Sequence, residues 1–144
     1  MPTLVTFDDL AEQVGKAVHN WSTHTLKVAL TNSAPNAATN TVLADITQIA
    51  ATGGYTAGAG GGYAVSGTSF TEAAGVATLN FTDLVITASG GSVGPFRYCV
   101  LYNDTATAPA DALIGYADYG SALTLADTET LTIDLTTGIL TVTA

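Results

Sequence analysis

The chain has 144 residues, of which 47% are apolar and 10% are charged. This length and apolar content suit one globular domain spanning residues 1–144, and they exclude a disordered chain. Twelve acidic residues against three basic ones give a net charge of −9. Nucleic acids and anionic membranes are therefore disfavoured as partners, because both are bound through clustered basic side chains. The charged fraction is far below the roughly 25% of typical soluble domains, which favours packing against neighbouring subunits.

The first residues lack the basic segment of a signal peptide, and no stretch approaches the ~18 apolar residues of a membrane-spanning helix. The single cysteine, Cys99, has no partner for an intrachain disulfide. We therefore expect synthesis and folding in a reducing cytoplasm. Cys99 lies in the most apolar predicted strand, where it is most simply a buried small apolar residue.

The first predicted element is an amphipathic helix over residues 6–21. Thr6 can cap its first turn, and Asp8 and Asp9 follow where the helix dipole favours anions. Its apolar residues recur at steps of three and four: Phe7, Leu10, Ala11, Val14, Ala17, Val18 and Trp21. We expect the helix to pack on the rest of the protein through Phe7, Leu10, Val14 and Val18.

The apolar period changes from about 3.6 to 2 near residue 24. Leu26, Val28 and Leu30 then predict a half-buried strand over residues 26–31. Residues 42–50 predict a short helical turn. A glycine-rich loop follows over residues 53–62; it lacks the Lys-Ser or Lys-Thr of a phosphate-binding loop. We interpret it either as a mobile surface loop or as an arm that a neighbouring subunit orders.

Short strands separated by turn residues occupy the rest of the chain. The predicted ranges are 64–70 and 76–81, which form a hairpin around residues 72–75, then 84–88, 96–102, 113–118, 123–125, 130–135 and 139–143. Residues 96–102 are apolar on both faces except at Arg97, which is typical of a central strand. We expect its Phe96, Tyr98, Val100 and Leu101 to share one interior with Leu131 and Ile133.

We expect the last two strands to form a hairpin through residues 136–138. With no long helices between the strands, this pattern predicts a mostly β fold: an antiparallel β-sandwich or jelly-roll-like barrel with one N-terminal α-helix.

Few residues suggest chemistry. Ser92 lies in a Gly-x-Ser-x-Gly string, but a strand follows it and no histidine comes later, so we interpret residues 90–94 as a flexible connection. His19 and His24 lack the further ligands that a metal site requires. Asp104, Asp127 and Glu129 form no recognised calcium loop, and we interpret them as turn residues. We therefore assign no catalytic, cofactor-binding or metal-ligating residues, and we expect neither a cofactor nor enzymatic activity.

Aromatic residues gather in the second half of the chain, as they do in carbohydrate-binding sandwiches. The set comprises Phe96, Tyr98, Tyr102, Tyr116 and Tyr119. Aromatic residues on strands are more often part of a core, and we favour that interpretation.

Several segments, taken together and in order, resemble a family of small virion structural proteins from tailed phages and prophages. They are VHNW (18–21), TLKVALTNSAP (25–35), VLADITQIA (42–50), GYTAG (54–58), GPFRYCVLYND (94–104) and LIGYADYG (113–120). The resemblance extends from the predicted helix to the final strands.

This resemblance implies a particle protein without catalysis that is made in the cytoplasm of a bacterial host. Such families include capsid decoration (cement) proteins, head fibres, and tail or baseplate proteins. We expect a decoration protein that binds the major capsid protein on the outer capsid surface and forms a homo-oligomer, with a trimer as the first expectation. Two alternatives remain: a tail, baseplate or head-fibre component with a receptor- or carbohydrate-binding role, and a hydrolase built around Ser92.

Overall fold

The computed structural model describes residues 3–136 and 139–144 and shows a mostly β protein built from antiparallel strands. In chain order the elements are β1 (Val5–Thr6), α1 (Leu10–Gly15), β2 (Leu26–Thr31), the 3₁₀ helix η1 (Leu43–Asp45), β3 (Tyr63–Ala64), β4 (Ser69–Ala73), β5 (Val76–Asn80), β6 (Leu84–Thr87), β7 (Val93–Thr107), β8 (Ala110–Leu125), β9 (Thr130–Ile133) and β10 (Leu140–Thr143). Among these elements, no helix is long and apolar enough to cross a membrane.

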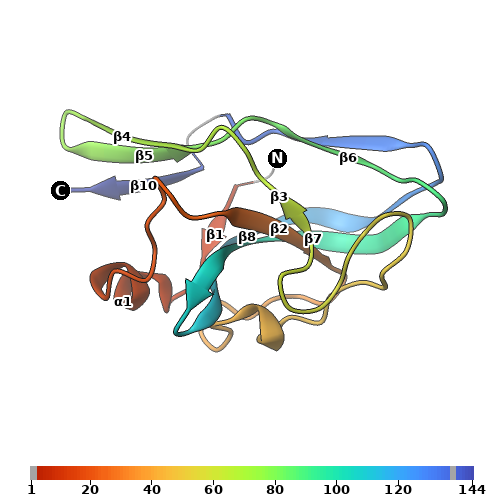
Figure 1. The fold of residues 1–144 in the computed structure, drawn as a ribbon, viewed down its shortest axis with the longest axis horizontal. Coiled ribbons are helices and arrows are strands. Elements are labelled where there is room, and N and C mark those ends of the chain that lie inside the picture. Colours follow the sequence, from red (N-terminus) through yellow and green to blue (C-terminus); the bar gives the residue numbers. More distant parts are fainter. Residues whose placement is uncertain (1–2, 137–138) are drawn as a thin grey trace.

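The strands form three sheets, with the orders β1-β8-β7-β2-β3, β10-β5-β4 and β6-β9. In Figure 1 the two smaller sheets lie together above one face of the five-stranded sheet, while α1 and η1 lie on its other side. The five-stranded sheet ends at β1 and β3, so the described strands do not close it into a barrel. This arrangement confirms the antiparallel, mostly β prediction.

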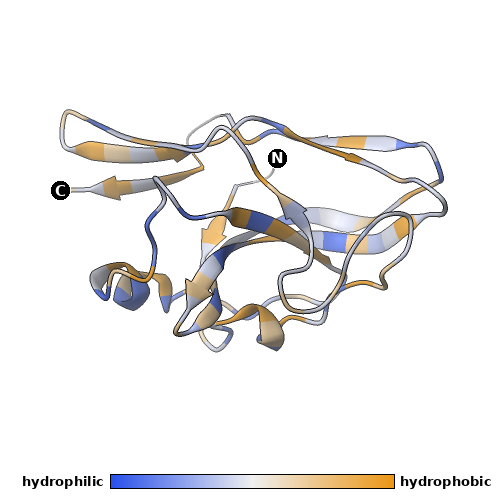
Figure 2. Cartoon of the chain, viewed as in Figure 1, coloured by the Kyte–Doolittle hydropathy of each residue, from blue (hydrophilic) through white to orange (hydrophobic). Residues whose placement is uncertain are grey.

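Two clusters of buried apolar side chains lie against the five-stranded sheet. Figure 2 shows hydrophobic residues along the strands of this sheet. The larger cluster lies between the layers and joins Leu30 and Leu101 to Leu79 and Ile133 of the smaller sheets. The second cluster includes Ala29, Val100, Tyr102, Leu113, Phe7, Leu43 and Ile46. The segment before α1 and the η1 region therefore cover the second face, and the central strands are buried on both sides.

The central-strand prediction is confirmed, because β7 lies between β8 and β2. Two strand details were wrong, one for residues 96–102 and one for residues 26–31. Val100 belongs to the second cluster, on the face opposite Leu101 and Ile133, since neighbouring side chains of a strand alternate between faces. Tyr98 is also absent from the cluster of Leu101 and Ile133, and its ring contacts Tyr116, which packs against the second cluster. The strand over residues 26–31 is buried on both faces rather than one, because Ala29 and Thr31 also have no exposed surface.

The predicted helix over residues 6–21 is much shorter in the structure. Val5 and Thr6 pair with β8 instead of joining a helix. α1 ends at Gly15, and Ala17 then takes a left-handed conformation (φ 59°). The amide of Val18 donates to the carbonyl of Gln13, and the amide of Ala17 to that of Val14, which is the Schellman pattern of a helix end.

The packing predicted for that helix holds at only some positions. Phe7 and Leu10 are buried, Val18 is partly buried, and Val14 is 38% exposed. Trp21 is buried without being helical. The predicted range 6–21 is therefore divided among the end of β1, the short helix α1 and loop segments on either side of it.

Two strand predictions need correction. β9 pairs with β6 and β10 pairs with β5, so the last two strands are not a hairpin with each other; residues 137–138 of their connection lie outside the described residues. The ranges 113–118 and 123–125 belong to one strand, β8, whose pairing with β7 shifts register between them. The hairpin of β4 and β5 and the short turn at η1 are confirmed. The predicted strand over residues 64–70 is divided between β3 and β4, which belong to different sheets.

Candidate functional site

The glycine-rich loop over residues 53–62 is held by its own chain rather than extended as an arm. Tyr55 is buried, and its hydroxyl accepts a hydrogen bond from the Leu30 amide (3.0 Å) and donates one to Gln48 Oε1 (2.8 Å). The Gln48 side-chain amide donates in turn to the Gly58 carbonyl at 2.9 Å. The predicted loop is thus confirmed, and it is fastened to β2 and to the segment that follows η1.

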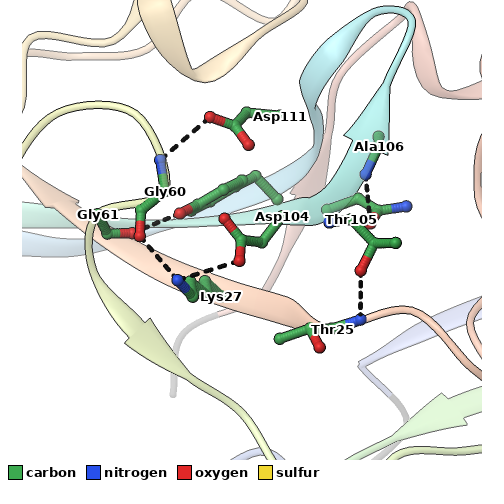
Figure 3. A network of polar contacts seen from close by, with 10 residues as sticks. Thr25, Lys27, Gly60, Gly61, Asp104, Thr105, Ala106 and Asp111 are labelled. Carbon is green, nitrogen blue, oxygen red and sulfur yellow. Dashed lines mark hydrogen bonds and ion pairs between the residues drawn. The ribbon is translucent and has the colours of Figure 1, made fainter.

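The far end of this loop is held by a charged network, which Figure 3 shows. Lys27 Nζ lies 3.0 Å from Asp104 Oδ2 and donates to the Gly60 carbonyl at 2.7 Å. The Gly60 amide donates to Asp111 Oδ2 at 3.2 Å, and the Tyr102 hydroxyl donates to the carbonyl of the next glycine. Asp104 was interpreted above as a turn residue, which is wrong: it lies on β7 and serves as the counterion of Lys27.

A cavity of about 370 Å³ lies beside this network, between η1, the glycine-rich loop and the start of β8. Its lining includes Ile46, Gln48, Gly58 and Asp111. Sequence reasoning missed Lys27 and Asp111 because their partners are distant in the chain. The only local signal was a lysine on a strand whose other residues are apolar or Thr.

The two histidines converge on one amide group. His19 Nδ1 and His24 Nδ1 lie 3.1 and 2.9 Å from Asn103 Nδ2, while Asn103 Oδ1 accepts from the amides of Thr105 and Ala106. Both ring nitrogens act as acceptors toward an N–H donor, which is the role of a neutral imidazole. Burial, followed by the proximity of His24, lowers the pKa of His19 to about 4.

No metal centre forms around these histidines within the described ranges, where no group of three or more His, Cys, Asp or Glu residues is placed to hold an ion. Asp127 and Glu129 act as turn residues, as predicted: Asp127 accepts from the Gly90 amide at 2.9 Å and Glu129 from the Ala126 amide at 2.7 Å. Cys99 is buried, and this burial raises its pKa to about 12.

Ser92 lies in the connection from β6 to β7, so a strand and not a helix follows it. This strand–turn–strand geometry contradicts the hydrolase alternative built on the Gly-x-Ser-x-Gly string, which needs a strand–turn–helix. The connection is also packed, since the Thr52 hydroxyl donates to the Ser92 carbonyl and the Ser89 amide donates to the Gly53 carbonyl.

The aromatic residues of the second half belong mainly to the interior. Phe96, Tyr98 and Tyr102 are buried, whereas Tyr116 and Tyr119 are partly buried. Tyr116 packs its ring against Phe7, with 5.4 Å between the ring centroids. The structure therefore supports the core interpretation more than an aromatic platform for sugars.

Every basic side chain in the sequence is engaged in an ion pair within the molecule. Lys16 pairs with Glu12, Lys27 with Asp104, and Arg97 with Asp118, where Nε and Nη2 reach the two carboxylate oxygens at 2.7 and 2.9 Å. Nine of the twelve acidic residues have no such partner, because only three cations exist. The net charge of −9 is thus carried by acids without an ion-pair partner.

Comparison with protein-family models, with curated proteins and with solved structures finds no match for this chain.

Proposed function

We propose that this chain is a virion structural protein of a tailed phage and that it decorates and stabilises the outer surface of the capsid. The particle assignment is motivated by the segments that, taken together and in their order along the chain, resemble a family of virion structural proteins. The binding partner in this proposal is the major capsid protein, at many equivalent sites, where multivalency strengthens weak individual contacts.

The observation that carries the outer location is the charge distribution. Because Lys16, Lys27 and Arg97 are all paired internally, no described cation is left to neutralise phosphates. Nine acids without ion-pair partners would repel a packaged genome at close range. An acidic protein of this kind suits the outer side of a shell.

The fold supports a structural role through its rigidity. We describe the two layers as a β-sandwich, with apolar clusters on both faces of the larger sheet. The glycine-rich loop is fastened to this frame by Tyr55 and Lys27, so it presents a preformed surface for docking. A preformed loop loses less conformational entropy on binding than a mobile one. The proposal also includes a homo-oligomer, for which a trimer is the first expectation.

A tail, baseplate or head-fibre position with a receptor- or carbohydrate-binding role is the second candidate. It requires aromatic side chains on an accessible surface. Only Tyr116 and Tyr119 of the five aromatic residues are partly exposed, and Tyr116 packs against Phe7 and Tyr98. The burial of the others favours the decoration role.

The test compares particles made with and without the gene for this protein. Electron cryo-microscopy should show density for it at many equivalent sites outside the shell, and the particles without it should lose DNA at a lower temperature and in low ionic strength. Adding the purified protein back should restore stability. Density confined to the tail, or equal stability of the two kinds of particle, would refute the proposal.

A further inference from the structure

A groove of about 520 Å³ separates α1 from β10. Its lining includes Leu10, Ala11, Val14 and Trp21 on one side and all four residues of β10, Leu140–Thr143, on the other. This volume lies within the roughly 300–1,000 Å³ of ordinary binding sites. Among the described residues four large apolar side chains are exposed, and two of them, Val14 (38%) and Val142 (44%), line this groove.

β10 is an edge strand with one free side. It pairs with β5 alone among the described strands, and in Figure 1 it lies on the α1 side of its sheet. The Ala144 amide donates to the Gly75 carbonyl. Because antiparallel pairing alternates, residues 140 and 142 also bond inward, and Thr141 and Thr143 direct their amides and carbonyls away from β5.

This edge lacks two features that commonly block strand addition. Residues 140–143 include no charge and no proline. The edge strand of the larger sheet, β1, ends beside the groove, and its Thr6 is part of the lining. An extended segment placed here would gain main-chain hydrogen bonds from β10 and apolar contacts from Leu10 and Trp21, as in β-strand addition.

The charge of the groove indicates what kind of segment fits. Asp8 lines it, is exposed, and makes no hydrogen bond or ion pair with a described side chain. A second copy of this chain offers no free cation to Asp8, because its three basic residues are paired internally, and it would bring a further nine negative charges. A basic segment of a different protein is the complementary occupant.

We propose that the groove between α1 and β10 binds an extended segment of a partner protein, with alternating apolar side chains and a basic residue that meets Asp8, and that this segment adds as a strand to β10. The proposal does not depend on the capsid location proposed above. The homo-oligomer proposed above then uses other surfaces.

The test uses the isolated full-length protein and two capped synthetic hexapeptides. The first has the sequence Lys-Val-Thr-Val-Thr-Val, and the second replaces its lysine with glutamate. Trp21 is the only tryptophan of the chain and lines the groove, so its fluorescence reports occupancy directly. Hydrogen exchange at the Thr141 and Thr143 amides reports strand addition.

Two variants of one residue separate strand addition from simple apolar contact. Thr141→Pro removes an outward amide that β5 does not use, and an edge strand accepts proline at such a position. Thr141→Ala keeps the amide and serves as the matched control. Near-UV circular dichroism of each variant checks that the fold is kept.

We expect the lysine peptide to bind saturably, to shift the Trp21 emission and to protect the Thr141 amide. Thr141→Pro should weaken binding up to about tenfold, the effect of one lost main-chain hydrogen bond, while Thr141→Ala changes it less than about twofold. The glutamate peptide should bind up to about fivefold more weakly, and Asp8→Asn should remove that preference.

Three results would overturn the proposal. The first is no saturable binding of the lysine peptide at millimolar concentration. The second is equal affinity of Thr141→Pro and Thr141→Ala. The third is an oligomer in sedimentation whose Thr141 amide is already protected without peptide, because the occupant would then be a second copy. If particles with and without the protein were equally stable while the lysine peptide still bound, the function proposed above would be refuted and the groove proposal would stand.

Discussion

The hydroxyl group of Tyr55 takes the place of a strand partner for Leu30. It lies 3.0 Å from the Leu30 amide nitrogen and accepts its hydrogen bond. β3 pairs with β2 only at Lys27 and Val28, and beyond that point the outer edge of β2 meets only an isolated bridge between Thr31 and Gln48. The carbonyl of Leu30 is satisfied by the Ile49 amide. One tyrosine and one loop amide thus complete the hydrogen bonding of a buried edge.

Tyr55→Phe should lower the free energy of unfolding by about 1–3 kcal/mol, because it leaves the buried Leu30 amide without an acceptor. Urea denaturation followed by fluorescence measures the loss. Tyr116→Phe is the matched control, since the Tyr116 side chain is only partly buried. Equal stability of the two variants would show that the Tyr55 hydroxyl contributes nothing to the anchoring of the loop.

Val100→Ala should cost about 1–3 kcal/mol, because Val100 has no exposed surface and packs in the second apolar cluster. Val85→Ala provides the control, since Val85 is 56% exposed on β6. Thermal unfolding of both variants gives the comparison. A cost at Val100 as small as that at Val85 would mean that the second face of the larger sheet is not a true core.

Gly62→Ala should destabilise the protein far more than Gly58→Ala. The two glycines have nearly the same backbone conformation, with φ of 92° and 93°, so both substitutions bear the strain of a left-handed residue. At Gly62 a Cβ would lie 2.8 Å from the Val28 carbonyl carbon, whereas at Gly58 nothing lies within 4 Å.

The added cost at Gly62 should be about 1–3 kcal/mol, the usual range for overpacking. Hydrogen exchange at the Gly60 and Gly61 amides should rise in Gly62→Ala and stay low in Gly58→Ala. Similar stability and exchange in both variants would contradict the close approach of this loop to β2.

The free energy of unfolding should decrease as the pH falls from about 6.5 toward 4, because of His19. Burial lowers the pKa of His19 to about 4 in the folded state, while an unfolded histidine titrates near 6.5. Between these values the unfolded chain binds more protons, so acid favours unfolding. Protonation would also place an N–H of His19 against Asn103 Nδ2, where the ring now accepts.

Denaturation at pH 7, 6 and 5 measures this dependence, and His19→Phe should flatten it while keeping a ring against Trp21. An NMR titration of His19 in the folded protein should show a midpoint near 4. A midpoint near 6.5 would contradict the lowered pKa of His19 and the pH dependence that follows from it.

The sequence predicted best where a local pattern coincides with the final partners. Residues 96–102 are apolar on both faces, and the strand that they form lies between β8 and β2 with both of its faces covered. The β4–β5 hairpin was likewise local, with its turn at Ala74 and Gly75. Periodicity failed at residues 6–21, because Thr6 pairs with β8 and the left-handed Ala17 follows the end of α1.

Contacts between distant parts of the chain could not be predicted from local patterns. Nothing around Lys27 indicates Asp104 or Gly60 as its partners, and nothing around Leu140 indicates β5 in place of β9. Nothing near His19 or His24 in the sequence indicates their shared neighbour Asn103, which comes from β7. The candidate sites depend on such distant partners, and only the fold brings them together.

The burial of β2 on both faces has a consequence for how the chain folds. β2 is synthesised early, but it pairs with β7, which comes from the second half of the chain. The partner of β1, which is β8, also comes from the second half. A nascent chain that has not reached β7 therefore exposes the apolar side chains of β2 to solvent. Such distant pairing is typical of domains that fold in milliseconds to seconds rather than microseconds. The β7–β8 ribbon, whose strands are joined by a short turn, is the local unit around which the earlier strands can assemble.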